Sequence, residues 1–225
     1  MIIVHHLDHS RSNRVLFLLE ELGVTYDIKS YGRDAQTLLA PRELKQIHPL
    51  GKSPVVEDGV NRIAESGAII TYLIETYGQG RLQPKPGTVE WRNYQYFLHY
   101  AEGSLMPLLL MSLVFSRISK PPAPWLLRPV AKAIEMAVKK KLLDPQTRTH
   151  FDFIESELKH RPWFAGAEFS AADVQMSYPI EAAESRVGYD ERPAIQDWLK
   201  RIRAKPSYQK AVARGGPASF NAGEI

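Results

Sequence analysis

Residues 48–66, with the sequence HPLGKSPVVEDGVNRIAES, combine basic, hydroxyl and acidic side chains in a pattern that suits a small anionic ligand. A Pro-Leu-Gly turn presents a lysine and a serine directly before Pro54. Two short apolar runs follow, joined by an Asp-Gly turn that is typical of a β-hairpin, and the second run ends in Glu65 and Ser66. A periodic helix begins directly afterwards, and the N-terminus of a helix attracts anions. The stretch therefore predicts a small anion-binding site.

Three histidines near the start of the chain, His5, His6 and His9, lie beside Asp8 and raise the question of a metal site. Neighbouring residues of a strand point to opposite faces, so His5 and His6 cannot easily share one ion. We therefore expect no metal site here.

Composition excludes several classes of function. The 225 residues include no cysteine, which rules out disulfides, thiolate metal ligands and catalysis by a protein thiol. The formal net charge is +4, with basic residues clustered at 139–141 and 200–203. A nucleic-acid-binding protein would show a stronger basic face or a recognisable motif. We interpret both clusters as solvated helix faces and expect no nucleic-acid partner.

A membrane-spanning segment is not expected either. The longest apolar run, residues 105–115, contains Pro107 and is far shorter than the roughly 20 residues that span a bilayer. The N-terminus lacks a basic region followed by an apolar one, which a secretory signal would require. The sequence thus favours a cytoplasmic protein without an integral membrane segment.

The first 80 residues predict a βαβαββα order of elements, because short β-branched runs alternate with apolar residues at helical spacing. Gly23 ends the first helix and Ser66 is the expected N-cap of the last one. A parallel pair of the first two strands requires a right-handed crossover. The expected strands lie at 2–4, 24–28, 54–57 and 61–64, and a short helix lies at 41–46.

Residues 81–88, which include two prolines and a glycine, predict a linker between residues 1–80 and an all-helical domain at 89–225. Pro107 should bend one helix, and Asp144 with Pro145 predicts the start of another. The spacing of Ser170 and Asp173 is that of a capping box.

The proline-rich segment 119–130, followed by a basic helix at 131–143, interrupts the helical pattern. It has three interpretations: a surface loop, the rim of a pocket, or a contact with a membrane surface. The surface loop is the preferred one.

Four motifs in this order resemble those of cytosolic glutathione transferases, most closely the serine-type members of bacteria and fungi. They are SRSNRVLFLLEELG at 10–23, HPLGKSP at 48–54, the Glu-Ser pair before the helix that ends near Tyr77, and FAGAEFSAADV at 164–174. The resemblance covers nearly the whole chain. It implies an α+β thioredoxin-like N-terminal domain, an all-α C-terminal domain, and glutathione as co-substrate.

Glutathione carries two carboxylates, one ammonium and a thiol, and the resemblance assigns a residue to each charge. Pro54 is the proline that the family keeps cis, and the backbone of Ser53 and Val55 would pair with the cysteinyl part of glutathione. Ser66 and the helix N-terminus would bind the γ-glutamyl carboxylate, and Glu65 its ammonium. Lys52, with Lys45 as a second candidate, would bind the glycyl carboxylate. Each residue also has a structural interpretation, as an N-cap, a first-turn charge or an exposed turn residue.

The resemblance also implies a group that activates the thiol. A free thiol has a pKa of about 8.5, which a helix N-terminus or a hydrogen-bond donor lowers. In serine-type relatives the hydroxyl comes four residues before an arginine like Arg14, which favours Ser10. Ser12, Asn13 and backbone N–H groups remain alternatives. The tyrosine-type pattern is absent, since Leu7 ends the first strand.

The implied function is a homodimeric glutathione transferase that conjugates glutathione to small apolar electrophiles in detoxification. Two alternatives remain: a glutathione-dependent peroxidase, isomerase or dehalogenase, and a non-catalytic glutathione-binding regulatory protein. Candidates for the electrophile pocket, each of which is also a plausible core residue, are Tyr94, Leu98, Leu105, Met106, Leu109 and Trp125.

Overall fold

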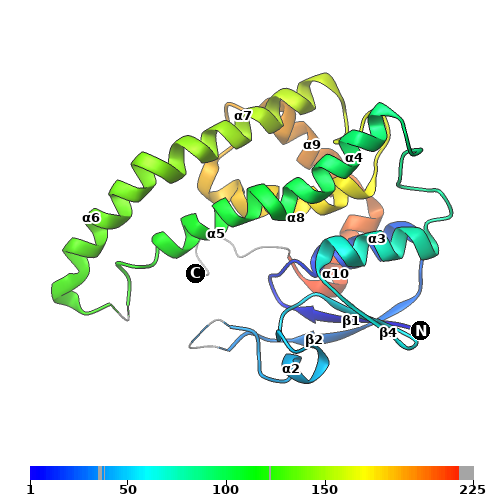
Figure 1. Ribbon diagram of the computed structural model, residues 1–225, viewed down its shortest axis with the longest axis horizontal. Coiled ribbons are helices and arrows are strands. Elements are labelled where there is room, and N and C mark those ends of the chain that lie inside the picture. Colours follow the sequence, from blue (N-terminus) through cyan, green and yellow to red (C-terminus); the bar gives the residue numbers. More distant parts are fainter. Residues whose placement is uncertain (35–36, 38, 122, 218–225) are drawn as a thin grey trace.

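The computed structural model describes residues 1–34, 37, 39–121 and 123–217, so Pro122 and the last eight positions of the expected helical domain lie outside the described residues. Its first part is a four-stranded sheet in the order β2-β1-β3-β4, with β1 parallel to β2 and the other pairs antiparallel. Figure 1 shows this sheet at one side of the molecule and the long helices of the second part running above it. The elements are β1 (Ile2–Leu7), α1 (Asn13–Leu22), β2 (Tyr26–Tyr31), α2 (Leu44–Ile47), β3 (Val55–Asp58), β4 (Asn61–Ala64) and α3 (Ser66–Tyr77).

The expected βαβαββα order is present, but the second strand begins later than the sequence indicates. Gly23 ends α1 in the left-handed region, at φ 71°, and the N–H of Val24 still bonds to the carbonyl of Leu19. Val24 therefore belongs to the helix cap, and β2 begins only at Tyr26.

The second part is helical from Val89 onward. Its elements are α4 (Val89–Tyr100), α5 (Met106–Phe115), α6 (Arg128–Val138), α7 (Asp144–His160), α8 (Ala171–Val187), α9 (Pro193–Ala204) and α10 (Pro206–Gly215). Between α5 and α6 the chain makes a turn and a short 3-10 helix, Trp125–Leu127, where the sequence indicates an interruption.

Two of the prolines that lie within the helices, Pro107 and Pro145, each follow a five-residue π-helical turn. The turn Ala101–Leu105 joins α4 to α5 before Pro107, and the turn Lys139–Leu143 joins α6 to α7 before Pro145. A proline lacks an N–H and clashes with the carbonyl four residues earlier, and the wider π-turn accommodates both defects. The predicted start of an α-helix at Asp144 is confirmed, but Asp144 is the first residue of α7 and not a free N-cap, because the π-turn connects α7 to α6.

The continuous helix Val89–Phe115 is long and apolar enough, by length and composition alone, to cross a membrane. However, 44% of its most apolar window is buried inside the protein, and the inward side chains include Phe97 and Leu98. A core helix of a globular protein has these same properties, so the segment is weak evidence for a span.

The two parts share one hydrophobic core, because the C-terminal helix returns to the sheet domain. Helix α10 packs against α1, which also contacts α8 and α3. The contact is close at Gly215, where a Cβ atom would lie 2.3 Å from the buried Leu16 side chain. Arg214 fixes the same helix through Glu20, at 3.0 Å, and through the ring of Tyr26.

The predicted capping box at the start of α8 is confirmed and is fully buried. The carboxylate of Asp173 accepts hydrogen bonds from the N–H and hydroxyl of Ser170, the N–H of Phe164 and the indole of Trp198, at 2.9–3.1 Å. Burial raises the pKa of Asp173 to about 6, while the four donors oppose that rise. The group is therefore ionised at neutral pH, and it joins α8, α9 and the preceding loop.

Replacing Asp173 by Asn should lower the free energy of unfolding by about 3 kcal/mol, since an amide offers one acceptor where two are used, and its NH2 would face buried donors. Urea denaturation of the full chain measures this. Ser170→Ala, which removes a single side-chain donor, should cost only about 1 kcal/mol. Equal costs for the two variants would contradict a central role of the carboxylate.

Candidate functional site

A cleft of about 250 Å³ lies beside the N-terminus of α3, where the sheet domain meets the helical domain. Its walls are Arg11, His48, Leu50, Lys52, Ser53, Pro54, Ala64, Glu65, Ser66 and Glu102. Five of the six residues that the sequence assigns to glutathione binding are therefore brought together. The sixth, Lys45, is not part of the wall, and its side chain lies against Gly51.

The Ser53–Pro54 peptide bond is cis, as the family resemblance implies. The Ser53 hydroxyl donates to the carbonyl of His5, at 2.9 Å, and accepts from the N–H of Leu7. This side chain is thus bound to β1, so the part of Ser53 that suits a ligand is its backbone.

Glu65 and Ser66 form the end of the cleft at α3, but their roles in the helix differ from the prediction. Glu65, not Ser66, is the N-cap, and Ser66 is the first helical residue with a buried side chain. Glu65 adopts φ 70°, a strained conformation for a residue with a side chain, and such strain concentrates at ligand sites. The first N–H groups of a helix have no partner within it, so this end offers donors and positive potential to an anion.

The candidate thiol-activating residues form a buried hydrogen-bonded chain next to the cleft, without lining it. Ser10 Oγ lies 2.7 Å from Ser12 Oγ, which lies 2.8 Å from His6 Nδ1. On its other side, His6 Nε2 lies 2.8 Å from the carbonyl oxygen of Gly215 in α10. Ser12 is fully buried, and Ser10 is 5% exposed.

The carbonyl at one end of this hydrogen-bonded series determines the direction of every hydrogen bond in it. A carbonyl only accepts, so His6 Nε2 carries a proton, and burial lowers the pKa of His6, which keeps the ring neutral. The Nδ1 atom then accepts from the Ser12 hydroxyl. Ser12 has no second proton, so it accepts from Ser10. The Ser10 hydroxyl consequently points inward, and it must rotate before it can donate to a ligand.

Asn13, the third candidate, is directed elsewhere. Its amide nitrogen donates to the carbonyl of Gly216 at 2.8 Å, and its amide oxygen has no hydrogen-bond partner among the described residues. The side chain therefore attaches α1 to the end of α10 instead of facing the cleft.

Two charged residues that sequence reasoning missed line the cleft, Arg11 and Glu102. Arg11 Nε donates to both carboxylate oxygens of Glu102, at 3.0 and 3.2 Å. Arg11 stands between the two serines that the sequence singles out, and Glu102 is the one acidic residue between positions 91 and 134. The isolation of Glu102 in the sequence is a signal, but only the fold shows that it contacts Arg11.

Arg14 is the buried counterpart of Arg11. Its guanidinium donates to Glu102 at 2.5 Å and to the carbonyl of Gln175 at 2.9 Å, and it lies over the ring of Tyr178. Burial lowers the pKa of Arg14, and the Glu102 carboxylate counteracts that effect. Arg14 therefore binds α1 to both α8 and the π-turn after α4.

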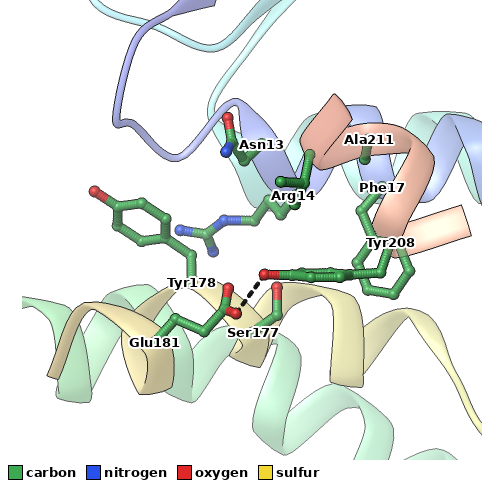
Figure 2. A pocket seen from close by; sticks show the side chains of 9 residues that line it. Asn13, Arg14, Phe17, Ser177, Tyr178, Glu181, Tyr208 and Ala211 are labelled. Atoms are coloured by element: carbon green, nitrogen blue, oxygen red, sulfur yellow. Dashed lines mark hydrogen bonds between the residues drawn. The ribbon is translucent and has the colours of Figure 1, made fainter. Parts of the chain in front are cut away.

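A second, small pocket of about 10 Å³ is lined by Arg14, and Figure 2 shows it between α1, α8 and α10. There the Tyr208 hydroxyl donates to Glu181, as the dashed line in Figure 2 marks. Arg14 Nε and Glu181 Oε2 have no hydrogen-bond partner among the described residues.

The six candidate pocket residues do not gather in one place. Tyr94, Leu105, Met106 and Leu109 are buried in the core, and Trp125 is 74% exposed on the turn before α6. Leu98 lines a groove of about 710 Å³ along α3 and α4, which shares Glu65 and Glu102 with the cleft. Their contact with an electrophile stays a prediction.

The histidines of β1 face in opposite directions, as strand geometry predicts. His5 Nδ1 lies 2.8 Å from the Tyr31 hydroxyl, whereas His6 contacts Ser12 and α10. Within the described part of the chain, no three His, Asp or Glu side chains come together as a metal site would require.

Two family models match the chain: "Glutathione S-transferase, N-terminal domain" over residues 1–75 and "Glutathione S-transferase, C-terminal domain" over residues 108–206. The chain belongs to the glutathione S-transferase family. The fold class expected from the sequence, a thioredoxin-like domain followed by a helical domain, is confirmed.

Individual members of the glutathione S-transferase family are similar over nearly the whole chain. Glutathione S-transferase 3 of Schizosaccharomyces pombe is 37% identical, with 95% of this chain and 88% of that protein covered. Glutathione S-transferase 1 of Saccharomyces cerevisiae is 35% identical, with 96% and 97% covered. Among solved structures, a glutathione S-transferase of Actinobacillus pleuropneumoniae superposes with a TM-score of 0.78 at 33% identity, with 96% and 93% covered.

The burial of His6 predicts a pH dependence of stability. Its pKa is lowered from the ordinary value of 6.5, so below that pH the unfolded chain binds a proton that the folded chain resists. The free energy of unfolding should therefore fall as the pH is lowered from about 7 to about 5. His6→Gln should reduce this fall in urea denaturation, while the exposed His99→Gln should not. An equal pH dependence in wild type and His6→Gln would contradict the assignment.

Proposed function

We propose that this chain is an enzyme that binds glutathione in the cleft and conjugates it, through its sulfur, to a small apolar electrophile. The observation that carries the proposal is the meeting of Lys52, Glu65 and Ser66 in one cleft at the N-terminus of α3. These residues provide one cation, one anion and a set of helix N–H donors. Glutathione, with two carboxylates and one ammonium, is complementary to that set.

Each end of glutathione has a complementary group in the cleft. The γ-glutamyl carboxylate suits the first turn of α3, and the adjacent ammonium suits Glu65. The glycyl carboxylate suits Lys52, and the extended backbone at Ser53 suits the cysteinyl part. Bound in this way, the thiol would point toward the loop before α1, where Arg11 lines the cleft.

The thiol must lose its proton before it can attack an electrophile. The N-terminus of α1 favours the thiolate, and a hydroxyl that donates to sulfur stabilises it further. Ser10 is the hydroxyl that we assign to this role. Its proton turns from Ser12 toward the sulfur when the ligand binds, at the cost of one hydrogen bond of about 1 kcal/mol.

Two serine substitutions, which should affect the thiol pKa differently, test this assignment. Ser10→Ala should raise the thiol pKa of bound glutathione by about one unit and lower kcat/KM about tenfold below that pKa. Ser12→Ala removes the competing acceptor, so the thiol pKa should not rise. Thiolate absorbance of the complex at varied pH measures both. A rise in Ser12→Ala alone would transfer the role to Ser12, and no rise in either would transfer it to backbone N–H groups.

Charge removal in the cleft should weaken glutathione binding without slowing the chemical step. Lys52→Ala and Glu65→Gln should each raise the KM for glutathione about tenfold, because each loses a charge-assisted hydrogen bond. Lys45→Ala is the matched control, since this lysine lies near the cleft but outside its wall. A change in kcat without a change in KM would contradict the assigned roles.

The activity itself is tested by retention on immobilised glutathione and by conjugation of glutathione to a generic aromatic electrophile. Failure to bind glutathione would contradict the proposal. Binding with turnover of hydroperoxides alone would favour the peroxidase alternative, and binding without any turnover would favour a regulatory protein.

We also propose that the domains divide at residues 81–88 and that the protein is a cytoplasmic homodimer that serves detoxification. The family resemblance supports these assignments, and the groove along α3 and α4 offers a surface to a second copy. Analytical ultracentrifugation measures the oligomeric state.

A further inference from the structure

The hairpin from α5 to α6 carries most of the exposed apolar surface of the described chain. We define the arm as residues 110–121 and 123–142. Ten of the sixteen large apolar side chains that are exposed in the described residues belong to it. Trp125, Leu126 and Leu127, at its end, are 74%, 68% and 58% exposed. Figure 1 shows this hairpin extending beyond the sheet domain, so neither domain covers it.

The arm is also strongly and almost purely basic. Residues 103–143 contain seven of the 29 basic residues of the chain but only one of its 25 acidic residues. That one, Glu135, is buried and accepts hydrogen bonds from Lys132 and Ser119. Outside this segment acidic residues outnumber basic ones, so the positive net charge of the protein originates from the arm.

Apolar and basic residues occupy different sides of α6. Leu127, Val130 and Ile134 recur at helical spacing and are each at least 50% exposed. Arg128, Lys132 and Lys139 also recur at helical spacing, on the opposite side. An exposed helix with an apolar stripe, a basic stripe and a tryptophan at its start has the composition of helices that lie in a membrane interface.

We propose that the arm docks on the surface of an anionic lipid bilayer. The side chains at its end enter the interface between headgroups and acyl chains, while the lysines and arginines face the lipid phosphates. Each basic residue near such a surface contributes roughly a fivefold increase in binding. The proposal concerns attachment to a surface and does not depend on the proposed transferase activity.

Charge favours this occupant over the two other candidates. A second copy docked on the same face by two-fold symmetry would place one basic arm against the other, and like charges repel. A nucleic acid would use the cations but would leave the tryptophan and leucines exposed to water, because phosphate contacts need no aliphatic surface. An anionic bilayer interacts with both kinds of residue, because its phosphates bind the cations and its acyl chains accept the apolar side chains.

Vesicle binding by the full chain tests the proposal. The wild type should sediment with vesicles of phosphatidylcholine mixed with phosphatidylglycerol, should not sediment with phosphatidylcholine alone, and should be released by high salt. Trp198 is buried and Trp91 and Trp163 are partly buried, so a blue shift of tryptophan fluorescence on binding would report Trp125.

Two sets of variants distinguish the contribution of the arm to vesicle binding from that of the overall charge. Replacing Lys120, Lys140 and Lys141 by Ala should weaken vesicle binding about a hundredfold. The matched triple Lys85, Lys200 and Lys210 to Ala removes the same charge from exposed positions elsewhere and should weaken it far less. Trp125→Ala should weaken binding at least about tenfold, whereas Val60→Ala, which changes a fully exposed apolar residue outside the arm, should not.

Four results would overturn the proposal. One is absence of binding to anionic vesicles at low salt, and another is equal loss in the two lysine triples. A third is dissociation of a dimer by Trp125→Ala, which would make a second copy the occupant. The fourth is tighter binding to a duplex oligonucleotide than to the vesicles. Circular dichroism and urea denaturation verify that each variant is folded.

Discussion

The buried guanidinium of Arg14 is the constraint on which the arrangement of the two domains depends. Moving a charge out of water costs several kcal/mol, so Arg14 can be buried only where its partners are fixed. Those partners, Glu102, the Gln175 carbonyl and the ring of Tyr178, all belong to the helical domain, whereas Arg14 belongs to α1. Because Glu102 also binds Arg11, this one carboxylate fixes both the domain contact and a wall of the cleft.

The loop before α1 is held from the opposite end of the chain. Gly215 accepts from His6, and Gly216 accepts from Asn13. Gly215 can come this close because it has no side chain, and its carbonyl sets which nitrogen of His6 carries the proton. That choice determines where the hydroxyls of Ser12 and Ser10 point. The proposed thiol chemistry at the start of the chain therefore depends on the packing of its last described helix.

Sequence patterns predict the features of this protein that are local. The order of the sheet domain, the capping box at Ser170 and the residues around Pro54 follow from turn chemistry, periodicity and the family motifs. The ion pair of Arg11 and Glu102 is not local, since the two residues are 91 positions apart and belong to different domains. Glu102 is part of no motif, and its contact with Arg11 results from helix packing.

Two departures from the predicted local structure share a cause, which is that the backbone adopts an uncommon geometry where the capping rules predict an ordinary helix start. Asp144 and Pro145 are typical of a helix start, but the π-turn before them lets the helix continue. Ser66 is a favourable N-cap, yet Glu65 takes that place in a conformation that costs energy. In each case a less favourable local geometry serves a longer structure, the arm in the first and the cleft in the second.

Cleft and arm differ in how their charges are balanced. In the cleft, cations and anions face one another, as Arg11 and Glu102 do, so its net field is small and recognition rests on the placement of individual groups. Along the arm, cations outnumber acids and the single acid is buried, so the field is additive and extends into solvent over about a Debye length. The first pattern suits a small ligand with charges of both signs. The second suits an extended surface of one sign, and the exposed apolar end of the arm requires that this surface also accept hydrocarbon.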